Sequence, residues 1–147
     1  MKVIVDDKIP YIREALATMM VDAMYMPGSA IDNTAVRDAD ALIIRTRTRC
    51  DATLLEGSRV QFIATATIGF DHINTAYCDA HGIRWTNAPG CNAASGRQYV
   101  QSVLLLLEAE GQLRLSTGTI GVVGVGHVGT LVADMAESWG MRVLRCD

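Results

Sequence analysis

The sequence predicts an α/β protein built on parallel sheets. Short runs of β-branched and apolar residues alternate with helical stretches along the whole chain, which is typical of this class. Several of these runs, such as residues 41–44, are continuously apolar, as buried strands are. A further apolar run at 120–123 leads directly into a Gly-x-Gly-x-x-Gly pattern, which indicates a strand, a tight turn and a helix.

The first ninety or so residues are expected to form one α/β unit. Strands are predicted at residues 3–5, 41–44, 62–64 and 83–86. Helices are predicted at 10–20, 51–55 and 73–81, the first opening on Pro10 and the last closed by Gly82. A long helix follows over about residues 92–110, with Asn92 as its N-cap and Gly111 after its end.

The glycine pattern lies in the setting that a dinucleotide site requires. A helix over 128–139 follows it, and a second strand at 141–146 ends beside Asp147. Backbone N–H groups at the start of such a helix can face a pyrophosphate, and an acid after the second strand can bind a ribose. The residues predicted to hold the dinucleotide are Gly124, Gly126, Gly129 and the backbone of His127. The alternative is a glycine-rich turn that binds nothing.

This second unit is expected to be incomplete. A dinucleotide fold contains about six parallel strands, whereas the sequence up to Asp147 supplies one β-α-β unit. The unit would then hold only the adenosine side of the cofactor. One face and both edges of its small sheet would lack their normal covering, so we expect poor order there or association with another chain.

Composition limits the partners. The net charge of −3 gives no reason to expect nucleic acid or an anionic membrane as a partner. The longest apolar run, 103–107, is far too short to span a bilayer. The four cysteines show neither a C-x-x-C pattern nor His/Cys metal spacing, so no metal site is predicted. Reduced thiols in the cytoplasm fit best, and Cys91, which has no marked catalytic partner, is expected to pack.

Two segments that follow strands are candidate anion sites. The turn from Thr65 to His72 can point backbone N–H groups and a threonine hydroxyl at an anion, or it can be an ordinary turn in which Asp71 caps the next helix. The segment 45–49 alternates arginine and threonine, so an extended conformation would put three guanidinium groups on one face, suited to phosphate or carboxylate. The alternative for that segment is solvated surface. Asp71 and His72 are adjacent, which rarely suits a catalytic dyad, so they are not assigned as one.

Taken in order, these motifs resemble the D-2-hydroxyacid dehydrogenase family, over essentially the whole chain. The glycine pattern is shared by many families. Two segments are much more specific, namely Ala88-Pro89-Gly90-Cys91-Asn92-Ala93 and the turn Thr65-Ala66-Thr67-Ile68-Gly69-Phe70-Asp71-His72. The other matching segments are Val5-Asp6-Asp7 with Pro10-Tyr11, Asp38-Ala39-Asp40-Ala41-Leu42 running into Arg45-Thr46, and Gly121 to Gly129.

The resemblance implies a domain organisation and an activity. Residues 1–92 would form a flavodoxin-like, parallel-sheet substrate domain, 93–111 an interdomain helix, and 112–147 the first β-α-β of a truncated Rossmann (doubly wound) NAD-binding domain. It further implies oxidation of the C2 hydroxyl of 4-phosphoerythronate, with hydride passing to NAD, in the pathway to pyridoxal phosphate. The full-length protein would be a homodimer.

The resemblance also implies roles for single residues. Thr46 and Thr67, together with Arg45, would contact the substrate. The backbone N–H groups of His127 and Val128 would meet the pyrophosphate. Asp147 would hold the adenosine ribose, and a carboxylate there favours NAD over NADP because it repels a 2′-phosphate.

No catalytic residue is assigned. The catalytic arginine, glutamate and histidine of the family have no counterpart before Asp147, and a hydroxyl proton cannot be removed without a positioned base. The 147-residue chain alone is therefore expected to be inactive. A local departure from the family is the glycine in Ser95-Gly96-Arg97-Gln98-Tyr99, where relatives have a branched apolar residue and an acid. Glycine in a helix costs about 1 kcal/mol relative to alanine, so we expect this helix to be weakened or bent.

Two other functions remain open. One is a dehydrogenase for another D-2-hydroxy acid, such as phosphoglycerate; the Arg-Thr-Arg-Thr segment and the Cys91-Asn92 pair favour 4-phosphoerythronate. The other is a non-catalytic nucleotide-binding or assembly module. A reading frame that continues with further strands, a second arginine-bearing loop and a late histidine would favour the enzyme over the module.

Overall fold

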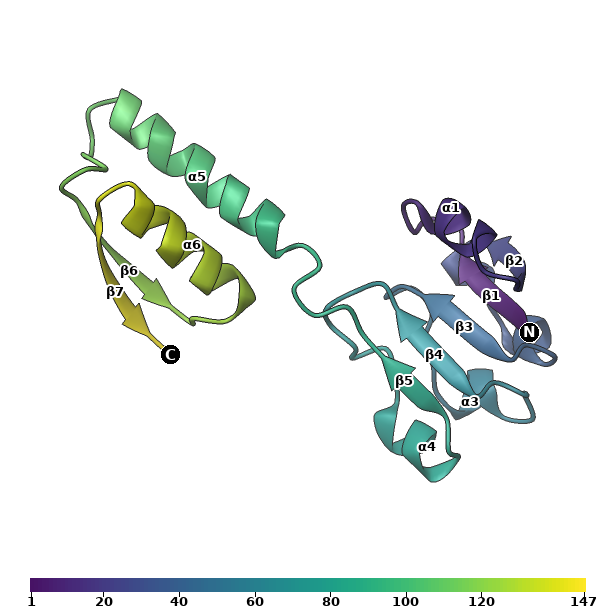
Figure 1. Cartoon of the computed structure of the whole chain (residues 1–147). Coiled ribbons are helices and arrows are strands. Elements are labelled where there is room, and N and C mark those ends of the chain that lie inside the picture. The colour runs from purple at the N-terminus through teal and green to yellow at the C-terminus, as the bar shows by residue number, and fades with distance from the viewer. The chain divides into compact units, whose positions relative to one another are not determined.

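The computed structural model describes residues 1–147, which form two compact units, Met1–Ala88 and Pro89–Asp147 (Figure 1). Each unit has hydrophobic clusters of its own. The long helix, α5 (Ala93–Ala109), belongs to the second unit. It runs without interruption through Gly96, and the weakening or bending expected from this glycine stays a prediction.

The first unit is a five-stranded parallel sheet in the order β2-β1-β3-β4-β5. Its strands are β1 (Lys2–Asp6), β2 (Asp22–Met26), β3 (Ala41–Ile44), β4 (Phe62–Thr65) and β5 (Arg84–Thr86). All four strand pairings are parallel. This order is that of the flavodoxin-like doubly wound sheet, which confirms the predicted fold class of this unit.

Helices cover both faces of this sheet. One face packs against α2 (Asn33–Val36), α3 (Ala52–Leu55) and α4 (Thr75–Ala80), and its buried strand residues are Ile4, Leu42, Ile44 and Ile63. The other face packs against Leu16 of α1 (Ile12–Ala17), and its buried strand residues are Val3, Val5 and Ala41. Successive side chains of a strand point to opposite faces, so a strand that is covered on both sides reads as a continuous apolar run.

Two features of the first unit differ from expectation. Strand β2, the short 3-10 helix at Gly28–Ala30 that follows it, and helix α2 were not predicted. Helix α1 is shorter than predicted, and Pro10 is not its first residue. The reason lies at Tyr11, whose φ of 58° is left-handed, so the helix can begin only after it, at Ile12. The predicted stop at Gly82 is confirmed, because this glycine follows α4 with a φ of +67°.

The second unit places α5 and α6 (His127–Ser138) with the parallel pair β6 (Thr119–Val123) and β7 (Arg142–Cys146). The helices bury residues against one side of this pair, and the apolar residues in this core include Leu104, Ile120, Val122, Val132 and Val143. On the other side Val123 is 88% exposed and Leu144 is 50% exposed. The expected uncovered face is confirmed; association of this face with another chain stays a prediction.

The cysteines are all unpaired, and they differ in burial. Cys50 and Cys78 are buried, whereas Cys91 and Cys146 are exposed. The expectation that Cys91 packs is wrong, because the turn at residues 89–92 holds it at the surface ahead of α5. Burial, together with the neighbouring Cys78 and Asp51, raises the pKa of the Cys50 thiol to about 12.

This contrast predicts selective thiol labelling. Because the thiolate is the reactive form and must also be accessible, only Cys91 and Cys146 should react with a thiol reagent in the folded protein at mildly alkaline pH. Unfolding in denaturant should expose the two remaining thiols, and mass spectrometry of the labelled peptides would assign each site. Fast labelling of Cys50 under native conditions would contradict this account of the core.

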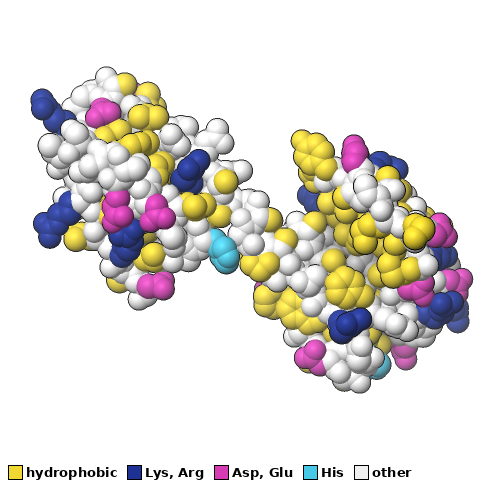
Figure 2. All heavy atoms as spheres, in the orientation of Figure 1, with side chains coloured by type: hydrophobic (Ala, Val, Ile, Leu, Met, Phe, Trp, Pro, Cys, Tyr) yellow, Lys and Arg dark blue, Asp and Glu magenta, His cyan; other side chains and the backbone are white.

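The surface carries mixed charge. On the face drawn in Figure 2, the Lys and Arg side chains of each unit lie among Asp and Glu side chains rather than in a patch of one sign. None of the helices has both the length and the apolar character that crossing a bilayer requires.

Candidate functional site

The first candidate site lies at the carboxyl edge of the sheet in the first unit. In a sheet of order 2-1-3-4-5, ligands bind outside the carboxyl ends of the strands where the strand order reverses, which is between β1 and β3. Arg45 and Thr46 follow β3 directly, and Thr67 follows the neighbouring strand β4. The topology therefore places all three predicted substrate residues at this edge.

The arginine-rich segment after β3 is a turn. The backbone N–H of Thr48 donates to the carbonyl of Arg45 at 3.2 Å, so the extended conformation that would align the three guanidinium groups is not formed. Thr48 is buried and donates its hydroxyl to the carbonyl of Gly28 at 2.9 Å, whereas Thr46 is exposed. Two of the arginines have partners within the protein. Arg45 donates to the carbonyl of Lys8 at 3.3 Å, and Arg49 pairs with Asp51 at 3.1 Å.

The turn after β4 is held by a chain of side-chain hydrogen bonds. Thr65 and Thr67 join their hydroxyl oxygens at 2.6 Å, and the Thr67 hydroxyl donates to the carbonyl of Gly69 at 2.9 Å. The Nε2 atom of His72 lies 3.0 Å from the Thr65 hydroxyl. The backbone N–H of Ala88 donates to the carbonyl of Thr67 at 3.0 Å.

The ordinary-turn alternative, with Asp71 as a helix cap, is wrong in one respect. The N-cap of α4 is Asn74, whose side chain accepts from the backbone N–H of Tyr77 at 3.0 Å. Asp71 lies exposed three residues earlier, in the turn itself.

A pocket of 330 Å³ opens beside this turn. The residues that line it are Thr46, Arg49, Gly69, Asp71 and His72. The structure thus brings the predicted residue Thr46 together with the turn after β4, whereas Arg45 and Thr67 are not among the lining residues. Arg49 and His72 lie in the two candidate anion segments, but neither was predicted to contact the substrate. The signal for His72 was its place at the end of a turn rich in hydroxyl groups, not its adjacency to Asp71.

Partial burial of the His72 ring lowers its pKa below the ordinary value of 6.5, against the opposing effect of Asp71. The unfolded chain then takes up a proton at a higher pH than the folded chain does. The stability associated with neutral His72 is therefore fully present above pH 6.5 and is lost as the pH falls through the folded-state pKa.

Urea unfolding at a series of pH values should detect this loss. The decrease in stability below pH 6.5 should be smaller in His72→Gln than in the wild type, because glutamine does not titrate. Equal slopes in the wild type and His72→Gln would contradict the burial argument.

The second candidate site is the glycine loop between β6 and α6. Gly124 has a φ of +84°, which favours glycine and gives the tight turn after the strand. Gly126 is the N-cap of α6, and a Cβ atom added there would meet nothing within 4 Å. A Cβ atom at Gly129 would overlap the carbonyl of Gly124, so this glycine lets the helix approach the loop closely. These are the three roles that a dinucleotide-binding glycine loop assigns to its glycines.

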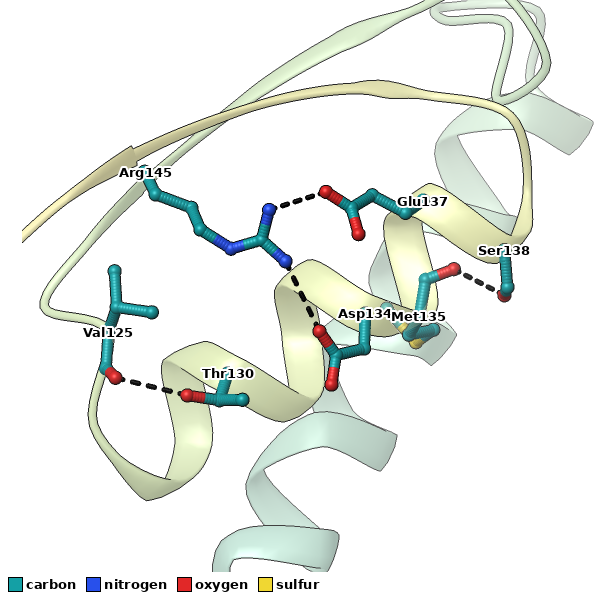
Figure 3. Close-up of polar contacts among 7 residues, drawn as sticks. All are labelled: Val125, Thr130, Asp134, Met135, Glu137, Ser138 and Arg145. Atoms are coloured by element: carbon teal, nitrogen blue, oxygen red, sulfur yellow. Dashed lines mark hydrogen bonds and ion pairs between the residues drawn. The ribbon is translucent and has the colours of Figure 1, made fainter.

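Asp147 lies against this loop. Its Oδ1 atom accepts a hydrogen bond from the backbone N–H of Val125 at 2.9 Å. The backbone N–H of Gly124 donates to the carbonyl of Cys146 at 2.7 Å, so the end of β7 and the loop are held side by side. The Thr130 hydroxyl donates to the carbonyl of Val125 at 3.0 Å, which ties the first turn of α6 to the same loop (Figure 3).

Charged residues of α6 pair with Arg145 near the end of β7, the strand that precedes Asp147. Arg145 of β7 bonds to Glu137 and, at 3.2 Å, to Asp134, both on α6 (Figure 3). The hydrogen bond from Arg145 lowers the pKa of Glu137, and the pKa of Arg145 is raised in turn. Exposed ion pairs contribute little stability individually, so this cluster adds only modestly to the packing of β7 on the helix.

The start of α6 also packs closely on the beginning of α5 and the turn ahead of it. Gly90, with a φ of +73°, lies where a Cβ atom would overlap the His127 ring, and a Cβ atom at Gly96 would come within 3.1 Å of the Val128 side chain. The glycine in α5 that sequence reasoning expected to weaken the helix therefore makes room for the first turn of α6. A pocket of 430 Å³ lies at this helix start, lined by Gly126, His127, Thr130 and Leu131.

Comparison with known families settles the family. The sequence pattern of the D-isomer specific 2-hydroxyacid dehydrogenase catalytic domain matches residues 3–101. The chain belongs to the D-isomer specific 2-hydroxyacid dehydrogenase family. The matched range runs from β1 into α5 and includes the carboxyl-edge pocket.

Curated relatives within this 2-hydroxyacid dehydrogenase family are similar over the whole chain. Erythronate-4-phosphate dehydrogenase from Bacteroides fragilis is 60% identical over 147 residues, which are 100% of this chain and 42% of that protein. The enzyme of the same name from Bacteroides thetaiotaomicron is 57% identical with the same coverage. That from Chromohalobacter salexigens is 46% identical over 100% of this chain and 38% of its own length. The chain thus spans less than half the length of these relatives.

Solved structures of the family show the same fold. An NAD+-bound 3-phosphoglycerate dehydrogenase from Entamoeba histolytica has a TM-score of 0.76 and 25% identity, over 100% of this chain and 54% of that chain. D-2-hydroxyisocaproate dehydrogenase has a TM-score of 0.79 over 99% of this chain and 52% of that chain, and at 18% identity it shows the fold alone.

No group of three or more His, Cys, Asp or Glu side chains is arranged to hold a metal ion.

Proposed function

We propose that this chain is the amino-terminal portion of an NAD-dependent dehydrogenase that converts 4-phospho-D-erythronate to 3-hydroxy-2-oxo-4-phosphooxybutanoate. The relatives that are 60% and 57% identical carry the name erythronate-4-phosphate dehydrogenase. The observation that carries the cofactor assignment is the hydrogen bond between the Asp147 carboxylate and Val125 in the glycine loop. This bond holds a carboxylate beside the loop. A ribose lies there when such a loop binds the diphosphate of a dinucleotide.

The two units have separate tasks in this proposal. The first unit binds the phosphorylated hydroxy acid at its carboxyl edge, with Thr46, Thr67 and Arg45 as contacts and the pocket beside Thr46 as the point of entry. The second unit binds NAD, with the N–H groups of His127 and Val128 at the start of α6 directed at the pyrophosphate. NAD, when bound, accepts the hydride from C2 of the substrate.

The acid at position 147 selects the cofactor. A carboxylate accepts hydrogen bonds from two free ribose hydroxyls, and it repels a 2′-phosphate. Oδ1 of Asp147 already accepts from Val125, and a carboxylate oxygen has a second lone pair that remains for a ribose hydroxyl. The proposed cofactor is therefore NAD rather than NADP.

Proton removal from the C2 hydroxyl is assigned to the catalytic arginine, glutamate and histidine of the family, which have no counterpart among these 147 residues. The purified chain alone should therefore bind NAD and produce no NADH from 4-phosphoerythronate. Turnover by the chain alone would contradict this assignment.

The assay that tests the substrate uses the longer protein that contains this chain. NADH formation is measured with 4-phosphoerythronate and with 3-phosphoglycerate in parallel. The proposal predicts a higher kcat/KM for 4-phosphoerythronate. The second candidate function is phosphoglycerate dehydrogenase, which is favoured by the 25% identity and common fold of the Entamoeba enzyme. A preference for 3-phosphoglycerate would establish that candidate instead.

The cellular setting is part of the proposal. An enzyme with this product serves the pathway to pyridoxal phosphate. Four unpaired cysteines are typical of a reducing compartment, so we assign the protein to the cytoplasm. The apolar residues Val123 and Leu144 are exposed here, which supports the proposal that their face of the sheet is covered in the full-length protein. For that protein we propose a homodimer.

A further inference from the structure

The hydroxyl groups of the turn after β4 form a continuous hydrogen-bonded chain with His72. The chain runs from His72 Nε2 to the Thr65 hydroxyl at 3.0 Å, from there to the Thr67 hydroxyl at 2.6 Å, and on to the carbonyl of Gly69 at 2.9 Å. Thr65 is 3% exposed, so its hydroxyl must be satisfied within the protein.

Counting protons along this chain fixes its direction. A carbonyl oxygen only accepts, so the Thr67 hydroxyl donates its single proton to Gly69. Thr67 must then accept from Thr65 in the bond between the two hydroxyls, and Thr65 has only one proton to donate. The Thr65 oxygen therefore accepts from His72, which requires a proton on Nε2 of the imidazole.

We propose that His72 is a positioning residue, which fixes the orientation of the Thr67 hydroxyl through Thr65 by donating a hydrogen bond from Nε2. Neutral His72 then carries no proton on Nδ1. Lowering of the His72 pKa by burial agrees with the neutral form at neutral pH. The partner of His72 is thus Thr65, seven residues away in sequence, rather than the adjacent Asp71.

The direction of the chain decides what Thr67 can offer to a ligand. Its proton is donated to Gly69 and one lone pair is filled by Thr65, so one lone pair remains and the oxygen acts as an acceptor. Thr67 is therefore suited to accept a hydrogen bond from a ligand hydroxyl. Anionic oxygens of a ligand would bind instead to groups that donate, such as Arg49 and Thr46 in the adjacent pocket. The sequence-based expectation that a threonine hydroxyl of this turn donates to an anion is reversed for Thr67. The identity of the hydroxyl-bearing ligand rests on the proposed function.

The test is the tautomer of His72, measured by ¹⁵N NMR of the imidazole in the 147-residue chain without ligand. The inference predicts a protonated Nε2 and an unprotonated Nδ1 in the wild type. Thr65→Val removes the acceptor and should turn this single tautomer into an exchanging mixture, whereas Thr65→Ser should restore it. Thr86→Val is the matched control, since Thr86 ends the neighbouring strand β5 and its hydroxyl bonds only to Asn87.

A wild-type His72 protonated on Nδ1 and bare on Nε2 would overturn the inference, because Thr65 would then donate its single proton to His72 and could not donate to Thr67. The same holds if a folded Thr65→Val, judged by its backbone amide spectrum, keeps the wild-type tautomer. If Thr65→Val does not fold, the wild-type and Thr65→Ser tautomers still decide the direction. Because no substrate or cofactor is present, failure of this test is separate from failure of the proposed function.

Discussion

Replacing Gly129 with alanine is expected to destabilise the second unit by about 1–3 kcal/mol, the usual range for overpacking. The added Cβ atom would overlap the carbonyl of Gly124 and lie 3.3 Å from the Val122 side chain. Because the carbonyl is backbone, relief requires α6 to move away from β6. Residue-resolved hydrogen exchange should show lost protection at Val122 and Val132, while Ile4 and Leu42 in the other unit keep theirs.

Two further glycines of the same unit provide matched controls. A Cβ atom at Gly121 or at Gly126 would meet nothing within 4 Å, and neither residue has a positive φ. Gly121→Ala and Gly126→Ala should therefore keep hydrogen exchange at Val122 close to that of the wild type. If Gly129→Ala protects Val122 as well as these two controls do, the close approach of α6 to the loop is not as described.

Asp147→Ala is expected to weaken NAD binding by roughly ten- to a hundredfold, the equivalent of about 1.5–3 kcal/mol for hydrogen bonds to a charged group. The carboxylate lies beside the loop through its bond to Val125 at 2.9 Å, and ribose hydroxyls would donate to it. NADP should lose far less affinity, because removing the negative charge also removes the repulsion of its 2′-phosphate. Calorimetric titration of both cofactors measures the two changes separately.

Asp134→Ala is the matched control for this experiment. It removes one negative charge from the same unit, but its partner is Arg145 rather than the glycine loop. NAD affinity should change little in this variant. An equal loss of NAD affinity in Asp134→Ala and Asp147→Ala would indicate a general charge effect and would contradict the assignment of Asp147 to the ribose.

Three of the strands predicted from the sequence lie in the interior of the first sheet. Residues 3–5 and 41–44 are continuously apolar because α1 covers one side of these strands and α2, α3 and α4 cover the other, whereas the apolar run 62–64 leaves Phe62 36% exposed. Strand β2 was missed for the opposite reason. It is an edge strand with partly exposed Met, Ala and Tyr side chains, and its pairing with β1, a tertiary interaction, holds it extended.

The same distinction applies to the sites. The glycine loop could be predicted because the roles of Gly124, Gly126 and Gly129 follow from local geometry at a strand–helix turn. The hydrogen bonds around the first site could not be predicted in this way. Arg45 bonds to Lys8, and Thr48 bonds to Gly28, across distances of 37 and 20 residues in sequence. Such partners are set by the sheet order, which a periodic pattern does not reveal.

The most direct test of the central claim is a calorimetric titration of the 147-residue chain with NAD, comparing the wild type with Gly126→Val and Gly121→Val. Valine at Gly126 would stand where the loop must come close to the diphosphate, whereas Gly121 lies within β6 with open space around it. The account predicts saturable binding by the wild type and Gly121→Val, and loss of binding in a folded Gly126→Val. Equal NAD affinity in all three proteins, or no binding by the wild type, would contradict it.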